Sequence, residues 1–200
     1  MAMKPGERRL SILQMLASML ENPRSEKVTT AALAARLEVS EAALYRHFAS
    51  KAQMYEGLIE FIESTLFSFI NKIQTETTEG VAQAEQTVVM LLSFAEKNPG
   101  MTRVLIGEAL VHEDERLQAR INQLTDKLEA ALRQSLRIAQ AANGWHGDAQ
   151  ADAAVLIAYV LGRWQLFAKS GFRRRPTEAW PAQWQMLQAC LSCAAASSAK

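Results

Sequence analysis

Three consecutive polar side chains, Tyr45, Arg46 and His47, lie within the stretch VSEAALYRHFASK. Leu44 and Phe48 are four residues apart, and in a helix this spacing places both on one face, where they can reach a core. The three polar side chains then point toward solvent. Tyrosine, arginine and histidine can hydrogen-bond to phosphates or to base edges. The stretch therefore suggests nucleic-acid recognition, provided that the neighbouring elements position it.

The neighbouring elements are predicted to be two short helices joined by a tight turn. Thr29 or Thr30 can begin the first helix, which runs to Leu37, because a hydroxyl oxygen accepts a hydrogen bond from a free amide in the first turn. Ser40 can begin the second helix, which runs to Phe48. Helix, short turn and helix form the helix-turn-helix unit. A plain helical hairpin has the same pattern, and on pattern alone this alternative stays open.

The outer face of the second predicted helix is small and polar. Besides the polar trio it presents Glu41, Ala42 and Ala43, and small alanines let a helix sink into the major groove of DNA. The predicted helix starts at Thr29, Thr30 and Ser40 are places where phosphate binds readily. These features favour DNA as the ligand.

Apolar residues recur at helical spacing along the chain, and no long stretch alternates with the period of two that marks strands. Ser50 and Gln53 form a capping-box pattern that begins a long helix. The predicted fold is all-α, with about nine helices that cover roughly 10–20, 30–37, 41–48, 51–73, 81–96, 101–110, 113–141, 151–169 and 181–193. We predict a helix-turn-helix DNA-binding domain over 1–50, a helical bundle for regulation and dimerisation over 51–195, and a disordered tail over 196–200.

The composition is that of a soluble globular protein, with 49% hydrophobic and 22% charged residues. The longest uncharged stretch, 153–162, is about half as long as a membrane span, and the first residues lack the apolar segment of a secretory signal, so a cytoplasmic protein is expected. Residues 1–52 hold 8 basic and 5 acidic side chains, a charge of +3 against +1 for the whole chain. A basic end suits a polyanionic partner.

Three other clusters have simple explanations. Cys190 and Cys193 lack a second pair of zinc ligands and are expected to be reduced thiols. The acids of HEDE at 112–115 complement a helix dipole. The run 173–175, three arginines, is expected to be solvated or to cap a helix, with a second phosphate-binding patch as the alternative. Since Gly-rich phosphate loops, a nucleophile elbow and clustered acid pairs are absent, we expect no enzyme, cofactor or metal site.

The helix-turn-helix residues resemble the DNA-binding domain of the TetR family, which is marked by Tyr-x-x-Phe and a Ser-Lys start to the fourth helix. Here these are Tyr45 to Phe48 and Ser50-Lys51. Further blocks are similar to the nucleoid occlusion factors of this family: LIEFIE at 58–63, EKNPGMTRVL at 96–105, RLQARINQL at 116–124 and RRRPTEAWPAQW near the end. Their order and spacing make a chance match improbable.

This resemblance implies a homodimer, joined through the last two long helices, that binds palindromic double-stranded DNA. The DNA-bound form is expected to bind the cell-division protein FtsZ and to block septum assembly over the chromosome, which places it in the cytoplasm, on the nucleoid. From the matching positions, the resemblance implies that FtsZ is contacted by Phe61, Lys97 and Asn98. It implies that DNA is contacted by Thr29, Thr30, Ser40, Glu41, Ala42, Ala43, Tyr45, Arg46, His47 and Lys51. The alternative is a TetR-type repressor released from its operator by a small molecule, which predicts an apolar pocket in the bundle.

Two positions depart from the family pattern. Glu38 stands in the turn where the family usually carries glycine. If this position keeps a left-handed backbone, a non-glycine residue costs about 1–2 kcal/mol, and a remodelled turn is the expected way to avoid that cost. Phe69 stands where a basic residue is expected on the FtsZ-facing helix.

Overall fold

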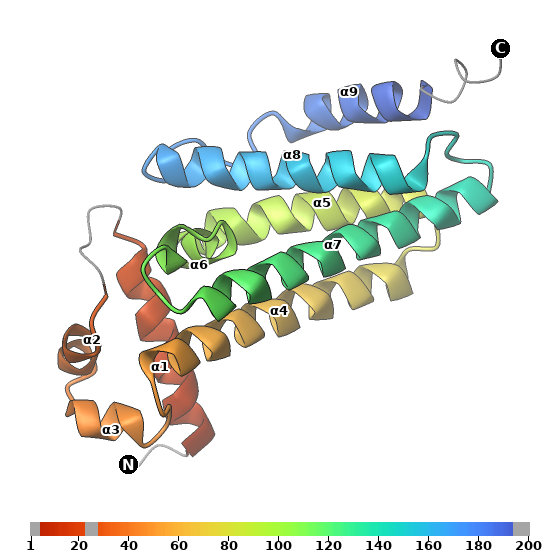
Figure 1. Ribbon diagram of the computed structural model, residues 1–200. Helices are drawn as coiled ribbons and strands as arrows, with labels where there is room; N and C mark the ends of the chain where they lie inside the picture. The colour runs from red at the N-terminus through yellow and green to blue at the C-terminus, as the bar shows by residue number, and fades with distance from the viewer. Residues whose placement is uncertain (1–4, 23–27, 194–200) are drawn as a thin grey trace. The chain divides into compact units, whose positions relative to one another are not determined.

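The computed structural model describes residues 5–22 and 28–193, and over these residues it contains nine α-helices, one short 3-10 helix and no strand (Figure 1). The predicted all-α fold is confirmed. By internal contacts the chain divides into two compact units, residues 1–64 with 98–122, and residues 65–97 with 123–200. The predicted domain boundary at residue 50 stays a prediction. The predicted tail at 196–200 and the side chain of Cys193 lie outside the described part of the chain.

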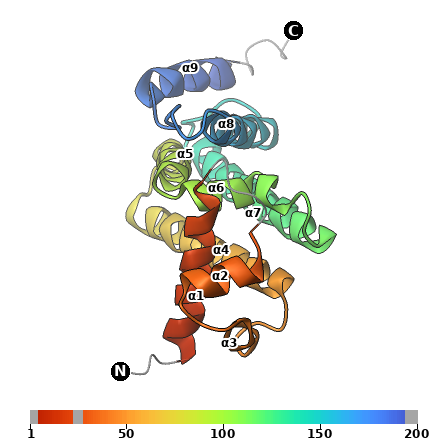
Figure 2. The ribbon, with the colours of Figure 1, turned by 90° about the vertical axis from the view of Figure 1, so that its left-hand side faces the viewer.

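The first unit contains the predicted DNA-binding helices. It consists of α1 (Pro5–Leu20), α2 (Thr30–Arg36), α3 (Glu41–Tyr45), the first half of α4 (Lys51–Glu76), α6 (Pro99–Leu105), the 3-10 helix η1 (Glu108–Leu110) and the start of α7 (Glu115–Ala141). Within it, α1 contacts α2 and α6, and α2 contacts α3 (Figure 2). Leu33, Leu44 and Phe48 are each only 1% exposed, so they form the core that orients α3.

The contact between α1 and α6 depends on a very close approach. A Cβ atom on Gly100 would lie 1.9 Å from the carbonyl oxygen of Ala17, so only glycine fits there. Arg103 of α6 donates hydrogen bonds to the carbonyl oxygens of Leu20 (3.1 Å) and Asn22 (3.2 Å). These bonds satisfy carbonyl groups at the end of α1 and help to fix where that helix stops.

The predicted helix over 101–110 is interrupted, because α6 ends at Leu105 and η1 begins only at Glu108. Gly107 lies in the break and has a φ of 76°, which glycine adopts without steric cost. The helical spacing of the apolar residues continues through the break, so the spacing alone did not reveal it.

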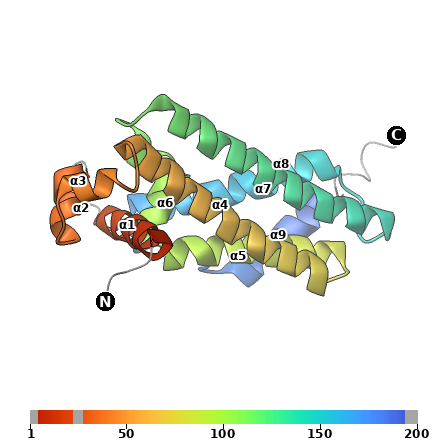
Figure 3. The ribbon, with the colours of Figure 1, turned by 90° about the horizontal axis from the view of Figure 1, so that it is seen from below.

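The second unit consists of the second half of α4, α5 (Gly80–Lys97), the remainder of α7, α8 (Ala149–Lys169) and α9 (Trp180–Cys193). α5 packs against α8, and the C-terminal ends of the two helices lie on the same side of this unit (Figures 1 and 3). Trp164 of α8 donates its buried indole N–H to the carbonyl oxygen of Leu91 (3.1 Å). This bond fixes the register between α8 and α5.

α8 is the one helix, within the described residues, that is long and apolar enough to pass a test of length and composition for a membrane span. Its packing is that of a core helix, because it lies on α5 and buries Asp152, whose carboxylate accepts a hydrogen bond from the indole of Trp145 (2.7 Å). Val155 and Leu166 remain 44% exposed. One apolar side of α8 is therefore left uncovered within this chain.

Candidate DNA-binding interface

Two hydroxyl groups begin the helices of the helix-turn-helix, as predicted. Thr29 Oγ1 accepts a hydrogen bond from the amide of Ala32 (3.1 Å), and Ser40 Oγ accepts one from the amide of Ala43 (3.3 Å). Each bond satisfies a first-turn amide that has no partner within its helix. The starts of α2 and α3 are thus fixed by side chains that the sequence identifies.

The turn between α2 and α3 keeps a left-handed backbone although it carries no glycine. Glu38 has a φ of 56°. The amide of Val39 reaches back to the carbonyl oxygen of Ala34 (3.0 Å), and that of Glu38 to Ala35 (3.1 Å), which closes α2. The expectation of a remodelled turn was wrong, because these bonds hold a left-handed residue in the turn, at the cost of backbone strain.

The polar trio lies outside the core but only partly on a helix. α3 ends at Tyr45, not at Phe48 as predicted, and the amides of His47 and Phe48 both turn back to the carbonyl oxygen of Leu44 (2.9 and 3.1 Å). Tyr45 is 45% exposed, Arg46 is exposed and His47 is half-buried. Tyr45 and Arg46 are thus the exposed members of the trio, at the end of α3 and at the start of the turn after it.

Arg9 of α1 supports this turn, a contact that local sequence pattern did not reveal. Its guanidinium donates a hydrogen bond to the carbonyl oxygen of His47 (3.0 Å) and lies 4.1 Å from the centre of the Phe48 ring. An arginine over an aromatic face gains cation–π attraction. The two partners are 38 residues apart in the chain, so no short-range spacing could indicate the pair.

A hydrogen bond joins the starts of α2 and α3. Thr30 donates its hydroxyl hydrogen to Glu41 Oε2 (2.6 Å). Ala42 beside it is exposed, while Ala43 is partly covered. This edge of the helix-turn-helix therefore offers small side chains together with one carboxylate, which can accept from the amino group of cytosine but repels phosphate.

Lys51 begins α4 but its charge is already paired. Its ammonium group forms an ion pair with Glu113, and the two side chains are only 21% and 10% exposed. The next acid, Asp114, accepts hydrogen bonds from the guanidinium and the amide of Arg116, which lower the pKa of Asp114 to about 2. The acidic run at 112–115 thus serves an ion pair and the start of α7, and a phosphate contact by Lys51 would compete with Glu113.

Comparison with known proteins decides the family. Residues 26–58 match the model of the bacterial regulatory proteins of the tetR family, and residues 78–192 match the SlmA-like form of the tetracyclin repressor-like C-terminal domain. The chain is 49% identical to the nucleoid occlusion factor SlmA of Alteromonas mediterranea, over 92% of this chain and 95% of that protein. It is 48% identical to SlmA of Marinomonas sp., over 94% and 96%. This chain belongs to the SlmA group of the TetR family.

Solved structures of lower sequence identity share the fold. A TetR regulator from Haloarcula marismortui matches with a TM-score of 0.78 at 15% identity, covering 93% of this chain and 98% of that one. FadR from Bacillus subtilis, in complex with stearoyl-CoA, matches with a TM-score of 0.74 at 11% identity, covering 90% and 97%. These likenesses establish the TetR fold alone, and SlmA membership rests on the sequence matches.

The residues predicted to contact FtsZ are distributed over both units. Phe61 lines an open hollow of about 300 Å³ in the first unit, together with Arg9 and Leu10 of α1. Asn98 belongs to the same unit and precedes α6, whereas Lys97 is exposed at the end of α5 in the second unit. Phe69 is 47% exposed. The assignment of these residues to FtsZ stays a prediction.

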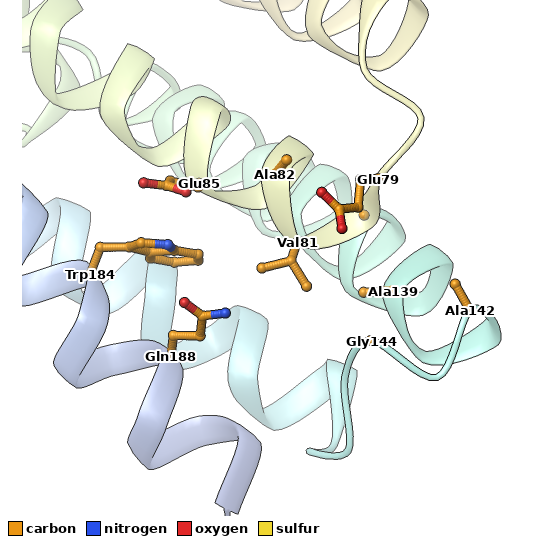
Figure 4. Close-up of a pocket in the computed structure, with 10 residues that line it drawn as sticks. Glu79, Val81, Ala82, Glu85, Ala139, Ala142, Gly144, Trp184 and Gln188 are labelled. Atoms are coloured by element: carbon orange, nitrogen blue, oxygen red, sulfur yellow. The ribbon is translucent and has the colours of Figure 1, made fainter.

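The second unit contains a cavity of about 380 Å³ between the start of α5, the end of α7 and α9 (Figure 4). Its walls include the carboxylates of Glu79 and Glu85, the amide of Gln188 and the ring of Trp184. The ligand-responsive repressor predicts a mainly apolar pocket. With two carboxylates in its wall, this cavity differs from that expectation.

Proposed function

We propose that this chain is a nucleoid occlusion factor: bound to palindromic DNA, it binds FtsZ and prevents septum assembly over the chromosome. The observation that carries the proposal is a capped helix-turn-helix with an exposed Tyr45-Arg46 pair in a chain 49% identical to an SlmA protein over almost its whole length. The family membership supports the cell-division role, and the geometry supports the DNA-binding step.

DNA binding follows from how α3 is held. The buried Leu44 and Phe48 turn inward, so the opposite side of α3 is available to the major groove. Arg46 and Tyr45 then reach phosphates or base edges, while the amides at the start of α2 can receive a phosphate. Because binding neutralises phosphates and releases counterions, the affinity should fall steeply with salt.

A dimer supplies the second half of a palindromic site. Val155 and Leu166 of α8 and Met186 of α9 are large apolar side chains left 44%, 44% and 68% exposed. Burying them against the same surface of a second copy removes apolar area from water and gives two-fold symmetry. Each copy of α3 can then read one half of the palindromic site. On this proposal the protein is cytoplasmic and lies on the nucleoid.

The proposal is tested by sedimenting FtsZ polymers with the protein, with and without genomic DNA fragments. We expect the DNA-bound protein to reduce the pelleted FtsZ, and the Arg46→Ala variant to lose this effect because it no longer retains DNA. The matched control is Arg137→Ala, at an exposed arginine of α7 whose side chain makes no hydrogen bond or ion pair in the described structure. Equal FtsZ pelleting by wild type with and without DNA would refute the proposal.

A further inference from the structure

The loop between α8 and α9, residues 170–179 and here named the arginine loop, presents three consecutive arginines to solvent. A connecting loop needs only to reverse the chain. Solvated basic loops are usually held by few contacts of their own. The contacts of this loop are therefore informative.

The backbone of the arginine loop is held from α8. Arg163 donates hydrogen bonds to the carbonyl oxygens of Arg175 (2.8 Å), Pro176 (3.0 Å) and Glu178 (3.1 Å). One guanidinium thus satisfies three loop carbonyls, in bonds that involve a charged donor and are stronger than neutral ones. Ser170 Oγ accepts the amides at the other end of the loop, those of Arg173 (3.0 Å) and Arg174 (2.8 Å).

A second anchor ties the loop to α5. Glu96 accepts a hydrogen bond from Thr177 Oγ1 (2.6 Å) and one from Arg175 Nε (2.7 Å). The next residue in α5 is Lys97, which is exposed. This contact therefore brings the loop beside the end of α5, where a contact with FtsZ is proposed.

The loop also contains backbone strain. Phe172 and Ala179 have φ values of 63° and 60°, in the left-handed region that is sterically unfavourable for residues other than glycine. The Phe172 ring packs on Phe167, with ring centres 5.1 Å apart. Strain of this kind persists only where the surrounding contacts hold it, and it gathers at functional sites.

These contacts fix the loop and leave several of its cations unpaired. Lys97, Lys169 and Arg174 have no ion pair in the described structure, and Arg173 uses only its Nε, on the carbonyl oxygen of Ser170. The helix dipole accounts for the lysines at the ends of α5 and α8, but not for Arg174. With Arg163 and Arg175 there are six basic side chains against Glu96 and Glu178, a local charge of +4.

We propose that the arginine loop and Lys97 bind an acidic segment of FtsZ, an inference that rests on the proposed function. The planar forks of Arg173 and Arg174 match carboxylates in two-point hydrogen bonds. Lys97 is one of the residues predicted to contact FtsZ, and the arginine loop is tied to the preceding residue, Glu96, within the same unit. An acidic protein segment can place single carboxylates beside the arginines. A DNA strand carries a continuous row of phosphates, which would also lie near the carboxylates of Glu96 and Glu178 and be repelled by them.

The test compares the affinity of DNA-bound full-length variants for FtsZ. We expect Arg174→Glu to weaken FtsZ binding roughly three- to tenfold, since it removes one exposed charge pair and adds a repulsive charge. Arg174→Gln should cause a smaller loss in the same direction. Arg137→Glu reverses the charge of an exposed arginine on α7 in the same unit and should change the affinity less than about twofold.

The outcomes separate this inference from the proposed function. If wild type does not bind FtsZ at all, the proposed function fails and the inference fails with it. If wild type binds FtsZ and Arg174→Glu behaves like Arg137→Glu, the inference alone is overturned. It is also overturned if Arg174→Glu weakens DNA binding while FtsZ binding by the DNA-saturated protein stays unchanged, because the loop would then contact phosphate.

Discussion

Glu38 in the helix-turn-helix turn gives a test of the strain argument, by the substitution Glu38→Gly. Its φ of 56° lies in the left-handed region, where a residue with a Cβ atom costs about 1–2 kcal/mol and glycine costs almost nothing. Its side chain makes no hydrogen bond or ion pair in the described structure and is exposed. Removing the side chain should therefore relieve strain without breaking a contact.

The expected gain is smaller than the strain itself. Glycine loses more backbone freedom on folding than alanine does, which costs roughly 0.5–1 kcal/mol and offsets part of the relief. The net increase in the free energy of unfolding should be about 0.5–1 kcal/mol. Urea unfolding followed by circular dichroism measures it, as a higher midpoint at an unchanged dependence on urea.

Two further variants separate strain from side-chain chemistry. Glu38→Ala keeps the Cβ atom and should be as stable as wild type within about 0.5 kcal/mol. Ala35→Gly, at an exposed position inside α2, should lose about 1 kcal/mol because no strain is relieved there. The reasoning is refuted if Glu38→Gly is less stable than Glu38→Ala.

Two other predictions concern charge. Burial raises the pKa of Asp152 more than the hydrogen bond from Trp145 lowers it, so the folded state favours the protonated acid. Protonated Asp152 therefore adds to the free energy of unfolding at low pH. This contribution is lost as the pH rises through the raised pKa. Asp152→Asn keeps an acceptor for Trp145 but cannot ionise. The free energy of unfolding of this variant, minus that of wild type, should therefore be higher at pH 7 than at pH 4. The same difference at both pH values would contradict this prediction. Glu113→Gln breaks the ion pair with Lys51 and frees the ammonium group to contact a phosphate. The slope of log affinity for DNA against log salt concentration should therefore steepen by about one. An unchanged slope would mean that Lys51 does not contact DNA.

Local sequence pattern was sufficient for most of the helix-turn-helix. Thr29 and Ser40 cap the helices as predicted, because a cap involves only residues two or three positions apart. The paired apolar residues Leu44 and Phe48 are buried for a similar reason, since their spacing determines the face on which they lie. The all-helical fold followed from the same spacing repeated along the chain.

Features that depend on distant residues did not follow from local pattern. The pairs Arg9–His47 and Lys51–Glu113 join positions 38 and 62 residues apart, and either basic residue could equally be solvated. The early end of α3 at Tyr45 also escaped prediction, because its continuing turn bonds and apolar spacing resemble a helix. The anchoring of the arginine loop by Arg163 and Glu96 likewise needed the structure.

In this SlmA-family protein, DNA binding and FtsZ binding are proposed to be coupled. The most direct measurement is the affinity for FtsZ, by fluorescence anisotropy, with and without a saturating palindromic fragment recovered from genomic DNA. We expect DNA to tighten FtsZ binding at least about fivefold, and FtsZ to tighten DNA binding by the same factor, because coupling between two sites is reciprocal. Equal affinity for FtsZ in the presence and absence of DNA would contradict this coupling.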